Sequence, residues 1–80
     1  MTTVKLIERD DVRLSVPSWR AARFRELLEL SGFSMQEMAV FMDCTYGYVR
    51  HFASESNVNI TADALRLLAY DLAYARGEIK

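Results

Sequence analysis

The stretch that decides the fold is SMQEMAVFMDCTYGYVRHF, residues 34–52. Ser34 stands three residues before Glu37, which is the spacing of a capping box, where each residue binds a backbone N–H at the start of a helix. Thr45 repeats the N-cap pattern shortly afterwards, which leaves room for only a short first helix and a tight turn. The stretch therefore predicts a helix-turn-helix unit that runs from about Ser34 to Ala53.

The two predicted helices carry residues that suit close packing against each other. Ala39 is small enough to let the second helix approach, and Val49 fills the contact from the other side. Met38, Met42 and Phe52 complete the predicted core of the unit.

A helix on each side of this unit completes the predicted body. Ser18 is a candidate N-cap after Pro17, and Gly32 supplies a C-terminal stop, so the first helix is expected over 19–31. Its polar face is expected to be solvated and to carry ion pairs three residues apart.

The last helix is expected over 62–76, because Thr61 can cap its start and Gly77 marks its end. One apolar stripe on it suits the core, and consists of Leu65, Leu68, Ala69 and Leu72. A second apolar face carries Leu67, Tyr70 and Tyr74, and it exceeds what one core contact requires. A homodimer interface would use it; the alternative is that the N-terminal segment or a loop covers it.

The N-terminal residues 1–16 have a different rhythm. Val12, Leu14 and Val16 alternate as in a β-strand, so residues 1–16 are expected to form either a short β-hairpin or an extended arm. No Asn-Gly or Asp-Gly turn is present to fix a hairpin register. Near the other end of the body, the Ser- and Asn-rich residues 54–59 predict a loop.

Composition limits the classes of protein. With 80 residues the chain can build only one core, and 51% hydrophobic with 26% charged residues is typical of a globular domain. No apolar run approaches the roughly 18 residues of a membrane span, so a cytoplasmic location is expected. Cys44 is the only cysteine, and a buried structural role is favoured over a reactive one. With one His, no catalytic set and no metal-ligand cluster, we expect no enzyme, metal or cofactor.

The stretch 34–52 resembles the helix-turn-helix of the phage repressor and Cro type, whose characteristic places are occupied here by Glu37, Met38, Ala39, Thr45, Val49 and Phe52. From Pro17 to Ala73 the chain is similar to the short anti-CRISPR-associated regulators of phages. Two positions depart from the pattern. Met35 stands where many relatives have Gln, with Gln36 next to it, and Asp43 stands in the turn where Gly is usual. Asp tolerates the left-handed conformation that such a turn requires.

The resemblance implies a mostly α, four-helix, helix-turn-helix domain over residues 17–80 that binds double-stranded DNA. The helix after Thr45 would enter the major groove, where Arg50 can bind guanine bidentately. The expected base contacts are Tyr46, Gly47, Arg50 and His51. The expected phosphate contacts are Ser34, Gln36, Thr45 and Tyr48, with Arg20 and Arg23 as flanking cations.

Each of the base-contact candidates has a plainer interpretation. Arg50 could instead form a surface ion pair with Glu55, His51 could be an inert surface residue, and Gly47 could be a chance occurrence. The expected function is a dimeric transcriptional regulator, a repressor that reads an inverted repeat with one helix per half-site; the resemblance also implies autoregulation. A net charge of -1 counts against DNA as partner, although residues 1–30 hold six of the ten basic side chains. The competing hypothesis is a phage-encoded protein-binding inhibitor or antitoxin on the same scaffold, which the tyrosines favour.

Overall fold

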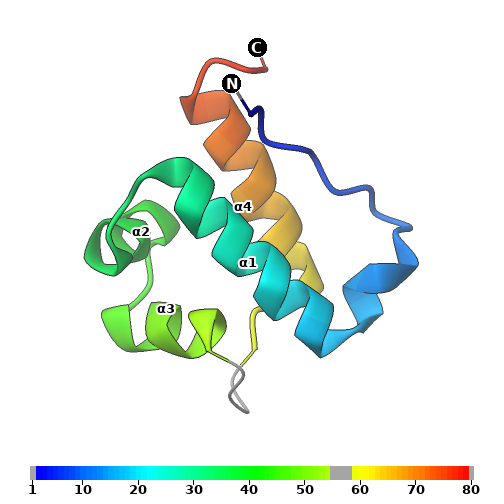
Figure 1. Cartoon of the computed structure of the whole chain (residues 1–80), viewed down its shortest axis with the longest axis horizontal. Helices are drawn as coiled ribbons and strands as arrows, with labels where there is room; N and C mark the ends of the chain where they lie inside the picture. The colour runs from blue at the N-terminus through cyan, green and yellow to red at the C-terminus, as the bar shows by residue number, and fades with distance from the viewer. Residues whose placement is uncertain (1, 55–58, 80) are drawn as a thin grey trace.

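The computed structural model describes residues 2–54 and 59–79, and these contain four α-helices, one 3-10 helix and no β-strand. The 3-10 helix η1 spans Val12–Ser15, α1 spans Pro17–Ser31, α2 spans Met35–Met42, α3 spans Tyr46–Ala53 and α4 spans Ala62–Ala75. The predicted mostly helical, four-helix fold is confirmed. In Figure 1, α1 lies across α4, while α2 and α3 lie together on one side of α1. The two chain termini lie at the end of the molecule opposite α3 (Figure 1).

Local capping explains where three of the helices begin. The Ser34 hydroxyl accepts the Glu37 N–H at 3.1 Å, and the Glu37 carboxylate accepts the Ser34 N–H at 2.9 Å, so the predicted capping box is confirmed. These bonds to Ser34 hold the pKa of Glu37 below its usual value. Thr45 caps α3 and Thr61 caps α4, both as predicted, each through a side-chain oxygen that accepts a backbone N–H at 3.2 Å.

The start of α1 differs from its predicted position. Pro17 is the first residue of the helix, and Val16 occupies the N-cap position without a side-chain hydrogen bond, so the prediction of Ser18 as N-cap is wrong. The physical reason is that proline suits the first helical turn, where its φ is already helical and its missing N–H would have no partner. Gly32 ends the helix in the left-handed conformation, with φ 71°, as predicted.

One core lies where α1, α2, α3 and α4 meet. Phe24, Met38 and Val49 are fully buried there, and Phe52 packs edge-on against Phe24 with ring centroids 5.6 Å apart. The predicted apolar stripe on α4 is buried throughout; it comprises Leu65, Leu68, Ala69 and Leu72. The predicted core of the helix-turn-helix is therefore confirmed, with Met42 and Phe52 partly buried at its margin.

The turn between α2 and α3 depends on one residue in an unusual conformation. Asp43 has φ 55° and ψ 49°, in the left-handed region that the resemblance assigns to glycine. Its N–H bonds the Val40 carbonyl at 3.2 Å, and the Cys44 N–H bonds the Ala39 carbonyl at 2.9 Å. Cys44 is half-buried against the core, and this burial, with a smaller contribution from Asp43, raises the pKa of its thiol. The turn thus holds α3 tightly against α2.

The described N-terminal residues form an extended arm and not a β-hairpin, so the hairpin alternative is wrong. Asp11 caps η1 by accepting the Arg13 N–H at 3.0 Å, and Ser15 donates its hydroxyl to the Val12 carbonyl at 2.8 Å. This local bonding competes with strand pairing. Hydrogen bonds from Arg13 lower the pKa of Asp11 to about 2. Of the alternating valines and leucine, only Leu14 is buried.

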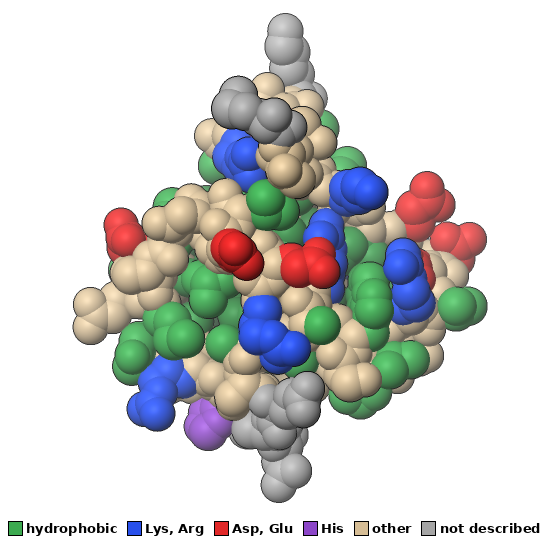
Figure 2. Space-filling model, in the orientation of Figure 1, with side chains coloured by type: hydrophobic (Ala, Val, Ile, Leu, Met, Phe, Trp, Pro, Cys, Tyr) green, Lys and Arg blue, Asp and Glu red, His purple; other side chains and the backbone are tan. Residues whose placement is uncertain are grey.

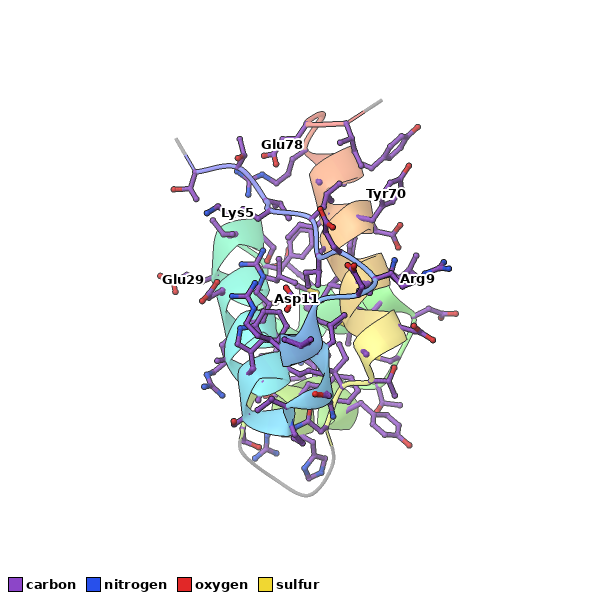
Figure 3. All side chains as sticks on the ribbon, turned by 90° about the vertical axis from the view of Figure 1, so that its right-hand side faces the viewer. Lys5, Arg9, Asp11, Glu29, Tyr70 and Glu78 are labelled. Carbon is purple, nitrogen blue, oxygen red and sulfur yellow. The ribbon has the colours of Figure 1, made fainter. Side chains whose placement is uncertain are left out.

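The arm is attached mainly by arginines of the helical body, each of which donates to a main-chain carbonyl. Arg76 binds the Thr2 carbonyl at 2.8 Å, Arg23 binds the Lys5 carbonyl at 2.7 Å, and Arg66 binds the Ile7 carbonyl at 3.4 Å. Val4, the one buried side chain of residues 2–8, donates its N–H to the Glu78 carboxylate at 2.7 Å. Glu78 is in turn paired with Arg76 at 2.9 Å. Figure 3 labels Lys5 on this arm and Glu78 on the segment that follows α4.

Two further predictions concern a loop and a membrane span. The loop expected over 54–59 falls mainly on residues 55–58, which lie outside the described residues. Within the described ranges, no helix has both the length and the apolar character that crossing a bilayer requires.

Candidate nucleic-acid interface

The candidate site is built on the outward face of α3. Val49 is fully buried and fixes the inner face of the helix on the core. Arg25 of α1 donates to the Ala53 carbonyl at 3.2 Å and so ties the last turn of α3 to the body. Because α3 is only eight residues long, these two attachments and the Thr45 cap leave it little freedom to rotate. Its orientation is therefore set by the fold.

All four predicted base-contact residues lie on the exposed side of α3. Tyr46 is 45% exposed, and Gly47, Arg50 and His51 are also exposed. The guanidinium carbon of Arg50 lies 5.9 Å from the centroid of the Tyr46 ring, four residues back along the helix. This distance is within the range of a cation–π contact, which limits the conformations that the arginine samples. The structure thus brings the predicted residues together on one surface.

A hollow in the surface runs beside this face. It is lined by Met35, Gly47, Arg50, His51, Ala53 and Ser54, so it connects the start of α2 with the outward face of α3. Figure 2 shows the histidine and a basic side chain at the end of the molecule that α3 forms. The hollow offers an apolar wall with basic groups at its rim, which suits the edge of a base pair with an adjacent phosphate.

Backbone N–H groups are left without a helical acceptor at the start of α3, whereas the Glu37 carboxylate occupies the Ser34 N–H at the start of α2. The cap on α3 uses the Tyr48 N–H and the Thr45 carbonyl accepts the Val49 N–H, so the amides of Tyr46 and Gly47 keep no acceptor within the helix. Ser34, Gln36, Thr45 and Tyr48 are all exposed, with the Tyr48 side chain partly stacked on Phe52 at 5.9 Å. Phosphate contact by these four residues is consistent with their positions and remains a prediction.

The two flanking arginines are placed differently from expectation. Arg20 donates to the Ile60 carbonyl at 2.8 Å and to the Leu14 carbonyl at 2.6 Å, and Arg23 pairs with Glu26 at 2.7 Å while it holds the arm. The expectation of a solvated arginine face is therefore wrong for both, because each guanidinium cross-links distant parts of the chain. Only the predicted ion pair three residues apart, between Arg23 and Glu26, is confirmed. Phosphate contact by Arg20 and Arg23 is untested.

Sequence reasoning missed Arg25 and Met35 as parts of this site. Arg25 carried no signal in the sequence, since its partner Ala53 is 28 residues away. In the sequence, Met35 is only a departure from the family pattern, but in the structure it lines the hollow together with Gly47. The alternative pairing of Arg50 with Glu55 lies outside the described residues.

Gly47 has no internal reason to be glycine. A Cβ built there would meet only the Thr45 hydroxyl, at 3.8 Å, which is an ordinary contact, and its φ is not in the left-handed region. Glycine inside a helix costs about 0.5–1 kcal/mol relative to alanine. The contacts that a Cβ would make here therefore do not account for a glycine at this position.

Among the described residues no group of three His, Cys, Asp or Glu side chains is arranged to hold a metal ion. No model of a known protein family matches the chain, and no curated protein or solved structure shows significant similarity to it.

Proposed function

We propose that this chain is a sequence-specific DNA-binding transcriptional regulator that inserts the outward face of α3 into the major groove. The observation that carries the proposal is the fixed presentation of Tyr46, Gly47, Arg50 and His51 on one exposed surface of a short helix, itself fastened to the core at Val49. A major groove about 12 Å wide accepts one helix, and base edges there present distinct donors and acceptors. Arg50 is the side chain that fits guanine best.

The proposed active form is a dimer that reads an inverted repeat, one α3 per half-site. A single small module buries too little surface for high specificity, and two-fold repetition of the contact supplies the rest. We propose repression, which also agrees with the resemblance to short phage regulators. A cytoplasmic location follows from the proposed target.

The test starts from a pool of random duplexes and from the DNA upstream of the chain's own gene. We expect enrichment of an inverted repeat whose half-site centres are about 10 base pairs apart. We also expect the affinity to fall steeply with salt: a complex with about four phosphate contacts should weaken about 100-fold between roughly 50 and 200 mM salt. A pool from which no sequence is enriched contradicts the proposal.

The same experiment separates the competing class, a protein-binding inhibitor or antitoxin. The exposure of Tyr46 at 45% and Tyr48 at 51%, with a net charge of -1, is compatible with a protein partner. In that case DNA binding should be weak and without sequence preference. We place DNA first because Arg50, exposed beside Tyr46, suits bidentate contact with guanine, and because nothing that a Cβ at Gly47 would meet accounts for a glycine there.

Gly47→Ala is predicted to stabilise the fold and to weaken DNA binding. Relief of the glycine cost should raise the free energy of unfolding by about 0.5–1 kcal/mol. The added methyl group would stand between the helix backbone and the groove. We therefore expect the affinity for DNA to fall about tenfold or more, and a tenfold fall corresponds to about 1.4 kcal/mol of binding free energy. Urea unfolding and DNA titration of the same preparation measure both effects. Equal affinity with higher stability would show that the glycine is incidental.

A further inference from the structure

The outer face of α4 carries an apolar ridge that nothing in the described chain covers. Leu67, Tyr70 and Tyr74 are 61%, 48% and 60% exposed, and Leu6 of the arm lies beside them with 50% exposure. This confirms that the second apolar face predicted from the sequence exists and that the described part of the arm leaves it open. Figure 3 shows Tyr70 projecting away from the body, on the same side as Arg9.

Opposite charges flank this ridge. On one side a hollow between the arm and α4 is lined by Arg9, Arg66 and Asp63, with Arg66 3.9 Å from Asp63, so the two arginines leave this flank with one excess positive charge. On the other side a hollow between the end of α2 and α4 is lined by Asp43 and Asp71. Leu67 lines both hollows and so forms the ridge between them.

The helix geometry keeps these flanks apart. At 3.6 residues per turn, Arg66 and Asp71 point about 140° apart around α4, with Leu67, Tyr70 and Tyr74 between them. Across its width the face thus has Arg66 on one side and Asp71 on the other, with the apolar ridge between them; Asp63, whose side chain is 98% exposed and lies 3.9 Å from Arg66, stands at the start of α4 in line with the ridge. Such a surface is complementary to a copy of itself in one orientation and not in the other.

Two-fold symmetry decides which orientation matches the charges. If the axis lies in the contact plane parallel to α4, the two helices run parallel and the basic flank of each copy faces the acidic flank of the other. If the axis is perpendicular to α4, the helices run antiparallel and like flanks face each other, which is unfavourable. The charges of the two flanks therefore favour the parallel arrangement, in which the two Asp63 side chains also approach each other, each beside Arg66 of its own copy at 3.9 Å.

The position of α3 selects the same arrangement independently. In Figure 1, α4 begins at the end of the molecule where α3 lies and runs toward the end that holds the chain termini. An axis parallel to α4 leaves both copies of α3 at one end of the dimer, while a perpendicular axis sends them to opposite ends. Only the first arrangement can present two helices to one face of a duplex.

We propose that the outer face of α4 binds a second copy of this chain, with the two α4 helices parallel and with Arg9 and Arg66 of each copy against Asp43 and Asp71 of the other. The α3 argument rests on the proposed function, but the charge argument does not, and the pairing requires no DNA. The proposal adds to the predicted dimer an orientation and a pair of charged contacts that decide it.

The test reverses one charge on each flank. Arg9 and Asp71 are exposed, and their side chains make no hydrogen bond or ion pair within the described residues, so Arg9→Glu and Asp71→Arg should leave the fold intact. We expect the wild type to sediment as a dimer at micromolar concentration without DNA. Each variant alone should dissociate at least about tenfold more readily, because like charges then face each other twice. An equimolar mixture of the two variants should restore the dimer as a heterodimer, since both contacts regain opposite charges.

Matched controls are Lys5→Glu and Glu29→Arg, which make the same charge changes on the opposite side of the molecule from Tyr70 (Figure 3). These should dimerise as the wild type does, and circular dichroism should show equal helix content for all variants. Leu67→Glu provides a second route, because a carboxylate on the ridge should give a monomer in either orientation.

Three outcomes would overturn the proposal. If the wild type is still monomeric at a concentration 100-fold above micromolar, the proposed interface does not exist. A mixture of Arg9→Glu with wild type that dimerises more tightly than the wild type alone indicates the antiparallel arrangement, because the introduced carboxylate would then face Arg9 of the other copy; in the parallel arrangement this mixture dimerises less tightly than the wild type. If the single variants dimerise as tightly as the controls, the proposed charged contacts do not contribute to the dimer. A dimer that enriches no DNA sequence would uphold this inference and contradict the proposed function, whereas a monomer that does enrich one would do the reverse.

Discussion

Arg50→Ala should abolish sequence-specific DNA binding and leave the fold unchanged. The side chain is exposed on the outward face of α3, and its guanidinium touches only the Tyr46 ring among the contacts described for it. Its removal deletes no core volume. A bidentate arginine–guanine contact discriminates by about 1–3 kcal/mol, and a symmetric dimer loses it twice, which amounts to a fall in affinity of between about 30-fold and about 10⁴-fold.

The measurement is a titration of the enriched duplex and of an unrelated duplex with wild type and variant. Arg13→Ala is the matched control, because it removes the same charge from an exposed arginine that belongs to η1. The variant at Arg50 should lose its preference for the enriched duplex, while the control should weaken both duplexes alike and only slightly. Unchanged preference in Arg50→Ala would show that another residue reads the bases.

Phe24→Ala should have the largest effect on stability. Phe24 is fully buried, lies at the junction of α1 and α3 and packs against Phe52. Truncation of a buried phenylalanine costs about 3–5 kcal/mol, because the cavity is only partly refilled. A chain of this length is expected to have a total stability of about 4–12 kcal/mol, so the variant should be close to unfolded at the lower end of that range.

Chemical denaturation and thermal melting both report this change. We expect Tm to fall by at least about 12 °C if the variant folds at all. Val40→Ala is the control, because Val40 is 83% exposed on α2 and its truncation should alter stability by no more than about 0.5 kcal/mol. A Phe24→Ala protein as stable as this control would contradict the assignment of Phe24 to the core.

Features that depend on neighbouring residues could be predicted from the sequence. The caps at Ser34, Thr45 and Thr61 act within three residues, and the helices that follow them were located to within one residue. The left-handed Asp43 also follows from local preference. The N-terminal segment was harder to predict, because the alternation of Val12, Leu14 and Val16 fits a strand but the capping bonds of Asp11 and Ser15 favour a helical turn.

The candidate site divides in the same way. The resemblance to a helix-turn-helix implied that Tyr46, Arg50 and His51 lie on the outward face of α3, and their exposure is confirmed. The uses of the arginines could not be predicted, because Arg20 and Arg25 bind carbonyls 40 and 28 residues away. A sequence shows that a guanidinium is available, but only the fold shows which carbonyl reaches it.

The attachment of the arm through carbonyl oxygens has a consequence for how this chain can change. Every residue type has the same carbonyl, so the identities of Thr2, Lys5 and Ile7 matter little to the bonds that hold them. Those bonds depend instead on Arg23, Arg66 and Arg76, which lie outside the segment they restrain. Apart from Val4, Ile7 and Leu14, which pack in or against the core, the arm can therefore accept new side chains, and with them new surface chemistry beside α4, without losing its place on the body.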